Sequence, residues 1–302
     1  IKLISFEKNF NEMINLYDGG NFPKVLLLNG MKGIGKFTLV FHFLNYIYSK
    51  NEKTTYNIKE NLIDINSKFY NSILNQTCRD VIFLQAEEGK NIKLDDIRNL
   101  KAVLSQSSLS QKSRFIIIDE VEFLNTNTVN ALLKTLEEPS KNNFFILINN
   151  QQTNLIETIS SRCLKNNIFL NLSQRKKILK YLIEDRKINL LIDDEEKLTP
   201  GLLIYYNELY HVFKISTTDN IFTKIKKLLY AYKKDKKKAL ISLSIFLIDQ
   251  FFYLRIKKNE NKIELLLNLK SAIVNKINDF VIYNININSV LNTIELKLKN
   301  VR

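Results

Sequence analysis

The fold of this chain is decided by one stretch of sequence, Asn130-Ala131-Leu132-Leu133-Lys134-Thr135-Leu136-Glu137-Glu138-Pro139. It follows an apolar run, Phe115-Ile116-Ile117-Ile118, that ends in Asp119-Glu120, and it precedes Ser161-Arg162-Cys163. The apolar spacing predicts an amphipathic helix over 129–136, which ends because a residue before proline is pushed out of helical geometry. Few protein families combine these four features in this order: a strand, an acidic pair, this helix and an arginine. The combination therefore identifies the fold much more specifically than any one feature does.

A phosphate-binding loop is predicted upstream, at Gly30-Met31-Lys32-Gly33-Ile34-Gly35-Lys36. It lies between an apolar run at 25–28 and a predicted helix over 36–49. Glycines allow backbone N–H groups to curve round phosphates, and the helix N-terminus adds a partial positive charge. Gly30, Gly33, Gly35 and Lys36 are therefore candidate nucleotide-binding residues, with Lys36 directed at the terminal phosphates.

The next position of the motif departs from the pattern. It should hold Ser or Thr, whose hydroxyl binds Mg²⁺, but it is Phe37, and Thr38 follows one residue later. A helix turns by about 100° per residue, so Thr38 does not simply replace the missing hydroxyl, although it stays a candidate contact. Two interpretations remain open, a scaffold loop that binds nucleotide weakly or not at all and a working ATP site. No cofactor is certain, and Phe37 weakens the case for ATP with Mg²⁺.

Asp119 and Glu120 stand where a nucleotide-binding site has its acidic residues. Asp119 ends the predicted strand, where a carboxylate would hold Mg²⁺ through water if the site is active, and no other metal site is expected. Glu120 stands where a base, vestigial or active, would polarise the attacking water. The other explanation is that both carboxylates cap the following turn without catalysis.

Arg162 lies between a predicted helix at 154–159 and a predicted strand at 168–170. An exposed arginine there would be able to contact a phosphate bound on a neighbouring subunit. A guanidinium supplied in trans raises phosphoryl-transfer rates by about 10³–10⁵. The alternative is an ordinary structural salt bridge.

The predicted elements divide the chain into three parts. Strands alternate with helices to about residue 170, which indicates a parallel sheet covered on both faces. Beyond it we expect helices only, the first running over 174–185 with Ser173 as its N-cap. The predicted domains are 1–170, 171–210 and 211–302, with breaks in the last near 258–261 and 284–288.

Composition limits the class of protein. A net charge of +14 suggests a polyanionic partner, although the densest run, Lys233–Lys238, is also explained as a solvated face. Two cysteines cannot form a zinc site by themselves. The apolar run at 239–248 is interrupted by Asp249 and Gln250 and predicts a buried helix too short to span a bilayer. We expect no signal peptide, no membrane and a cytoplasmic location.

The chain resembles the AAA+ subunits of the bacterial DNA polymerase III clamp loader over essentially its whole length, and among them the delta prime type. The matching segments follow the same order as in that family: Gly33–Lys36, Ile92–Arg98, Asp119-Glu120, Asn130–Pro139 and Thr158–Cys163. The resemblance implies an α/β AAA+ domain with a RecA-like parallel sheet, a small helical lid and an all-α collar that joins the subunits of a pentamer.

The resemblance also implies roles for single residues. Arg162 would act on ATP held by an adjacent motor subunit, and Asn149, or else Asn150, would be the first sensor. Phe37 departs from the motor pattern, as does Thr199-Pro200-Gly201-Leu202, which lacks an arginine after the glycine. The four-cysteine zinc module of many loader subunits is also missing. These departures favour a subunit that donates an arginine and is itself neither an active ATPase nor a polymerase, a point that the sequence leaves uncertain.

The implied partners are delta and gamma/tau type subunits, the sliding clamp and primed DNA within the complex. One alternative is the ATP-hydrolysing gamma/tau type motor, which predicts Mg-ATP binding that depends on Lys36. An alternative of another class is a stand-alone basic DNA-binding protein, which predicts tight, strongly salt-dependent binding without partners.

Overall fold

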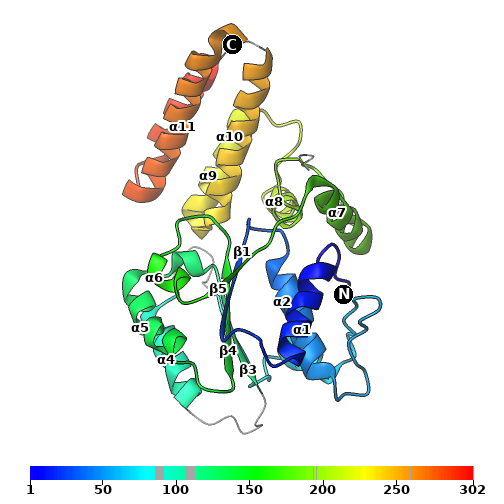
Figure 1. Ribbon diagram of the computed structural model, residues 1–302. Helices are drawn as coiled ribbons and strands as arrows, with labels where there is room; N and C mark the ends of the chain where they lie inside the picture. The colour runs from blue at the N-terminus through cyan, green and yellow to red at the C-terminus, as the bar shows by residue number, and fades with distance from the viewer. Residues whose placement is uncertain (86–91, 106–112, 193, 195, 259, 302) are drawn as a thin grey trace. The chain divides into compact units, whose positions relative to one another are not determined.

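The computed structural model describes residues 1–85, 92–105, 113–192, 194, 196–258 and 260–301 (Figure 1). Contacts within the chain divide it into two units. The first comprises Ile1–Asn189 with Asp194–Leu203, and the second comprises Leu190–Asp193 with Ile204–Arg302. The boundary falls inside one helix, so each unit is described by itself.

The first unit is built on a parallel sheet. Among the described residues it has five strands in the order β2-β3-β4-β1-β5, so the chain crosses over between consecutive strands. The central strands are apolar on both faces, as expected for a parallel sheet covered by helices on each side. The strands are β1 Val25–Asn29, β2 Val81–Leu84, β3 Arg114–Asp119, β4 Asn143–Asn149 and β5 Leu164–Asn167.

Helices cover the two faces of this sheet, with α1 and α2 on one side and α4, α5 and α6 on the other (Figure 1). Successive strand residues alternate between two apolar cores, for instance Phe115 and Ile117 in one and Ile116 and Ile118 in the other. The helices are α1 Glu7–Asp18, α2 Lys36–Ser49, α3 Lys68–Leu74, α4 Leu94–Ser105, α5 Thr126–Glu137 and α6 Glu157–Ser160, with a short 3₁₀ turn, η1, at Val121–Phe123.

Two predicted elements differ in the structure. The last strand is β5, not 168–170, because its backbone pairs with β1 although its side chains are mostly exposed. Ile168 and Leu170 are apolar because they are buried in the core, although they do not belong to the strand, and this apolar run led to the wrong prediction. The next helix, α7 Leu172–Arg186, starts before Ser173 because Asn171 and Gln174 form a reciprocal capping box.

The second unit is helical. In it α10 packs against α9 and α11, and α12 packs against α9 and α11. The breaks predicted near 258–261 and 284–288 are present, although residue 259 lies outside the described residues. The helices are α8 Pro200–Val212, which the unit boundary divides, α9 Ile221–Asp235, α10 Lys238–Lys258, α11 Ile263–Tyr283 and α12 Ile287–Lys299, with a 3₁₀ turn, η2, at Glu260–Lys262.

Helix α10 is longer than predicted. It continues through Asp249 and Gln250 to Lys258, and among the described helices it is the one whose length and composition would suffice to cross a membrane. One of its faces is buried against neighbouring helices, through Leu243, Leu247 and Phe252 among others. These residues place one face of α10 in the core of the helical unit.

Candidate functional site

The phosphate loop connects β1 to α2, as predicted. Its backbone depends on glycine at two points, since Gly33 has a φ of +77° and Gly35 a φ of +106°. A side chain is strained at such angles, whereas glycine adopts them freely. Gly30 is needed for a different reason, because a Cβ there would lie 2.5 Å from the Ile168 carbonyl oxygen.

Lys36 is the first residue of α2 and is only 3% exposed. Its ammonium group donates to the carbonyl oxygens of Gly30 and Met31, at 2.5 Å and 2.8 Å. Burial lowers the pKa of Lys36 to about 8, and the nearby carboxylates of Asp119 and Glu122 partly oppose that shift. The lysine is therefore held by the loop's own backbone.

The loop also packs against the start of α8, within the first unit. The Thr199 hydroxyl donates to the Lys32 carbonyl oxygen at 2.6 Å, and the Gly201 N–H donates to the Gly33 carbonyl oxygen at 2.8 Å. The two backbones are so close that a Cβ on Gly201 would lie 2.7 Å from the Gly33 oxygen. Two backbone carbonyls of the loop are thus bound by the chain itself.

The two predicted acidic residues lie at the end of β3. Burial raises the pKa of Asp119, although its carboxylate accepts hydrogen bonds from the Glu120 N–H at 2.8 Å and from the Asn150 amide at 3.1 Å. Glu120 has a left-handed backbone, with a φ of 56°, and its carboxylate forms a 2.6 Å ion pair with Lys32. A loop lysine therefore already neutralises the candidate base.

The structure distinguishes the two asparagines at the end of β4, Asn149 within the strand and Asn150 directly after it. Asn150 donates to Asp119, and its N–H donates to the buried carboxylate of Glu122 at 3.1 Å. Asn149 instead donates to the Asn29 side chain at 2.8 Å, on the neighbouring strand β1. Of the two candidates for the sensor position, Asn150 is the one that contacts the acidic pair.

Phe37 and Thr38 are both exposed on the first turn of α2, Phe37 by 41%. The Phe37 ring lies 5.6 Å from the ring of Phe83, and the two help to line a pocket of about 330 Å³. Asp119 lines the same pocket, which is otherwise almost wholly apolar. An aromatic ring thus stands beside the carboxylate where the motif has a hydroxyl.

These residues do not fit Mg²⁺ with ATP. Mg²⁺ requires several oxygen ligands in near-octahedral geometry, and Phe37 offers none. Among the described residues, no group of three or more His, Cys, Asp or Glu side chains could hold a metal ion. The Lys36 ammonium group, which would contact the terminal phosphates, donates instead to the carbonyl oxygens of Gly30 and Met31.

Arg162 lies at the end of α6, with its side chain 32% exposed. Its guanidinium contacts Glu137, the last residue of α5, through both Nε, at 2.6 Å, and Nη2. Nη1 donates to the Thr158 carbonyl oxygen at 2.9 Å. Arg162 is separate from the phosphate loop's contacts and is held at the surface by an ion pair.

Three contacts of the site were not predicted from the sequence. Glu122 is buried and binds the backbone of Asn150, Lys32 pairs with Glu120, and Thr199 binds the loop. A Glu two residues after the acidic pair carries no motif signal. The lysine and the threonine stand in quoted motifs, but their partners are far away in the sequence.

Comparisons with known proteins agree with this architecture. A family model described as DNA polymerase III, delta subunit, matches residues 6–170. DNA polymerase III subunit delta' of Pseudomonas aeruginosa is 31% identical over 140 residues, which are 46% of this chain and 41% of that protein. DNA polymerase III subunit gamma of Buchnera aphidicola subsp. Acyrthosiphon pisum is 29% identical over 163 residues, 54% of this chain and 42% of that protein. The matches thus span about two fifths of the length of these relatives.

A solved structure extends the comparison to the whole chain. A DNA polymerase III gamma subunit-related protein from Thermotoga maritima superposes over 99% of both chains with a TM-score of 0.52. At 17% identity this likeness concerns the fold alone. The predicted α/β fold, a parallel sheet covered by helices and followed by a helical region, is confirmed.

Proposed function

Since this chain belongs to the DNA polymerase III delta subunit family, we propose that it is a clamp-loader subunit of the delta prime type. It is a structural member of an ATP-driven pentamer that loads the sliding clamp onto primed DNA, and it acts in the cytoplasm. Its partners are delta and gamma/tau type subunits, the clamp and the DNA inside the complex. Its own contribution to hydrolysis is Arg162, offered to ATP on a neighbouring subunit.

One observation carries the choice of subunit type. Phe37 stands where a nucleotide site needs the Mg²⁺-binding hydroxyl, in a loop that otherwise keeps its glycines and its lysine. The bonds from Lys36 to the loop and from Gly201 to Gly33 support a scaffold role for that loop. A subunit with such a site has to act through ATP bound elsewhere.

The proposal includes a division into three domains. The AAA+ domain is 1–170, the lid 171–210 and the collar, through which the subunits associate, 211–302. The absence of strands after β5 among the described residues supports the last two.

The first test is equilibrium binding of ATP with Mg²⁺ to the purified chain. We expect no binding that depends on Lys36, so Lys36→Ala should match the wild type, as should the exposed control Lys53→Ala. Phe37→Thr restores the hydroxyl and is expected to increase Mg²⁺-dependent binding over the wild type. Lys36-dependent binding without turnover would leave the arginine-donating role standing and change only the role of the loop.

The second test uses the reconstituted loader. Arg162→Ala should slow ATP hydrolysis at the neighbouring site that it faces by about 10³-fold, and so lower the rate of the loader, while the pentamer still assembles. Arg98→Ala is the control, because Arg98 is an exposed arginine of α4 that pairs with Asp95 on its own helix. Normal hydrolysis and normal clamp loading by the Arg162→Ala complex would contradict the proposed role of Arg162.

The second candidate is the motor subunit of the same loader. It is favoured by the retained Lys36 and by relatives named gamma and tau among the matches. It predicts tight Lys36-dependent binding together with turnover that requires Asp119 and Glu120. That result in the first test would move the assignment to the motor.

A further inference from the structure

The second unit carries a strongly basic segment that the proposed function does not use. Residues 214–238 contain nine lysines and two aspartates and no other charged side chain, which gives a net charge of +7. That is half of the +14 of the whole chain. The segment includes the loop after α8, the whole of α9 and the first residue of α10. Such a concentration of charge favours a polyanionic partner.

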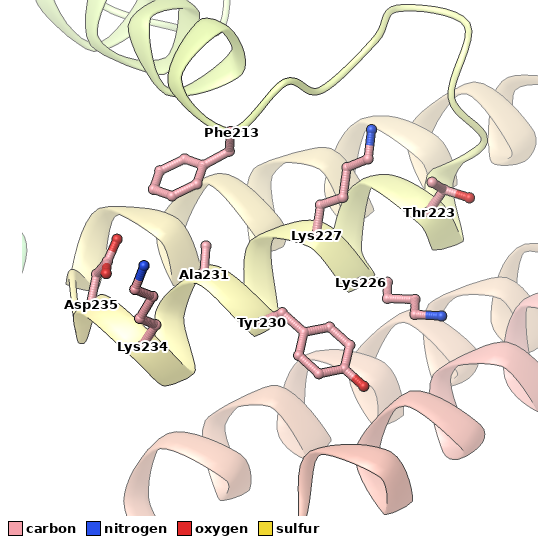
Figure 2. Close-up of a pocket in the computed structure, with 8 residues that line it drawn as sticks. All are labelled: Phe213, Thr223, Lys226, Lys227, Tyr230, Ala231, Lys234 and Asp235. Atoms are coloured by element: carbon pink, nitrogen blue, oxygen red, sulfur yellow. The ribbon is translucent and has the colours of Figure 1, made fainter.

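An open pocket of about 620 Å³ lies on α9 within this segment (Figure 2). The α9 residues that line it recur at helical spacing, from position 223 to position 235, so they share one face of the helix. Phe213, which follows α8, lies near the small side chain of Ala231, and the Tyr230 side chain extends from α9 away from Phe213 (Figure 2). The Tyr230 hydroxyl donates to the Asn288 side-chain oxygen at 3.2 Å. The pocket therefore combines two aromatic rings with three lysines and one carboxylate, that of Asp235, so its lining has a net positive charge.

The lysines of this pocket differ in their contacts. Lys227 forms a 2.7 Å ion pair with Asp219 and donates to the Lys214 carbonyl oxygen at 2.8 Å. Lys226 and Lys234 are exposed, four residues to either side of Tyr230. Lys227 is thus engaged within the protein, and the other two present their charges to solvent.

We propose that this face of α9 binds single-stranded nucleic acid. Lys226 and Lys234 contact phosphates, and Tyr230, a residue that is 44% exposed, stacks its ring on a base. Basic grooves with exposed aromatic rings bind single strands because every unpaired base offers a face for stacking. A duplex keeps its bases stacked on one another, so the rings would contribute nothing to binding it.

The size of the surface is consistent with this ligand. From Thr223 to Asp235 the helix rises by about 18 Å, at about 1.5 Å per residue. This is the length of about five nucleotides at about 3.4 Å per phosphate along one strand. An acidic protein segment would satisfy the lysines equally well, but it would not use the rings.

The test is the binding of a fluorescent oligothymidylate of about twenty nucleotides to the whole chain, followed by anisotropy between about 50 and 200 mM NaCl. The double variant Lys226→Gln, Lys234→Gln removes two phosphate contacts. It should weaken binding by at least about tenfold and lower the slope of log K against log salt by about 1.4. Tyr230→Leu should weaken binding by at least about fivefold, and Tyr230→Phe, which keeps the ring, should not.

The matched control is Lys257→Gln, Lys258→Gln, which removes the same charge from the exposed end of α10 and should leave binding within about twofold of the wild type. Three outcomes would overturn the proposal: no binding by the wild type at low salt, equal losses in the two double variants, or equal competition by poly-glutamate. No other loader subunit is present, so the result is independent of the function proposed above.

Discussion

His42 lies in the core of the first unit, with its Nδ1 2.8 Å from the Tyr56 hydroxyl. Its Nε2 is buried and has no hydrogen-bond partner among the described residues. Burial, with a smaller contribution from the charged N-terminus, lowers the pKa of His42 from 6.5 to about 3. On acidification, His42 therefore binds its proton at a higher pH in the unfolded chain than in the folded one.

The pH dependence of stability follows from this difference. As the pH falls below 6.5, the unfolded state gains a proton that the folded state does not bind, and the free energy of unfolding decreases by up to about 1.4 kcal/mol per pH unit. The loss ends near pH 3, where the folded state also binds the proton. We expect denaturant unfolding between pH 7 and about 5 to show this loss.

His42→Gln should flatten that dependence, although it lowers stability at neutral pH. His211→Gln, at the exposed end of α8, serves as the control and should keep the slope of the wild type. Identical slopes for the wild type and His42→Gln would show that other groups cause the acid loss.

At the scale of single elements, the beginning of α7 gives a sharp test. Asn171 accepts from the Gln174 N–H at 2.9 Å, and Gln174 accepts in return from the Asn171 N–H. Asn171→Ala should therefore lower the free energy of unfolding by about 1 kcal/mol. Ser173→Ala, two residues on, should change it by less than about 0.5 kcal/mol, and the reverse order of effects would contradict the capping box.

The contact between the phosphate loop and α8 is a second element-scale prediction. Ala at position 201 would place its Cβ 2.7 Å from the Gly33 oxygen and 2.9 Å from its Cα, so the two backbones have to separate. We expect Gly201→Ala to cost about 1–3 kcal/mol in thermal or denaturant unfolding. Gly19→Ala is the milder control, since its Cβ meets one carbonyl oxygen at 3.0 Å. No loss in Gly201→Ala would mean that the loop does not depend on α8.

The elements that the sequence predicted well have strong internal patterns. The central strands are continuous apolar runs, and α4 repeats its apolar residues at helical spacing. The local sequence pattern is therefore enough to locate these elements. β5 has the opposite character, with exposed side chains such as Leu164 and Lys165. Its existence depends on hydrogen bonds to β1, and no local pattern reports a pairing partner far away in the sequence.

In the candidate site, too, the sequence predicted the residues of local motifs but not their contacts with residues far away in the chain. The loop, Lys36 and the acidic pair were predicted because a motif fixes their spacing. Asn149 and Asn150 were both left open, and the alternation of strand residues directs them to different neighbours, Asn29 and Asp119. The choice between them required the register of β4 against β1 and β3, which only the three-dimensional structure supplies.

At the scale of the whole molecule, the structure separates two kinds of surface. The first unit holds the nucleotide-site residues and Arg162, whereas the second holds the lysine-rich face of α9. If the proposed function is right, the loss of Arg162 in the first unit should affect ATP hydrolysis only in the assembled loader. A defect on α9 should appear in the isolated chain.

Glu137 provides a prediction for the assembled loader. It holds Arg162 by two nitrogens of the guanidinium and thereby fixes the direction of a side chain that is proposed to reach a neighbour's ATP. Since small misplacements of a catalytic group cost large factors in rate, Glu137→Ala should lower ATP hydrolysis by the loader by about tenfold. Glu137→Gln keeps an oxygen that can accept from Nε and should retain more of the rate.

Glu138→Ala is the matched control, because Glu138 is the adjacent exposed glutamate and Arg162 pairs with Glu137 instead. Unchanged hydrolysis in Glu137→Ala would show that Arg162 needs no orientation from α5. Faster hydrolysis would show that the ion pair competes with the phosphate, and that the arginine leaves Glu137 when it acts. A slower rate that Glu137→Gln partly restores would establish Glu137 as a positioning residue for the arginine.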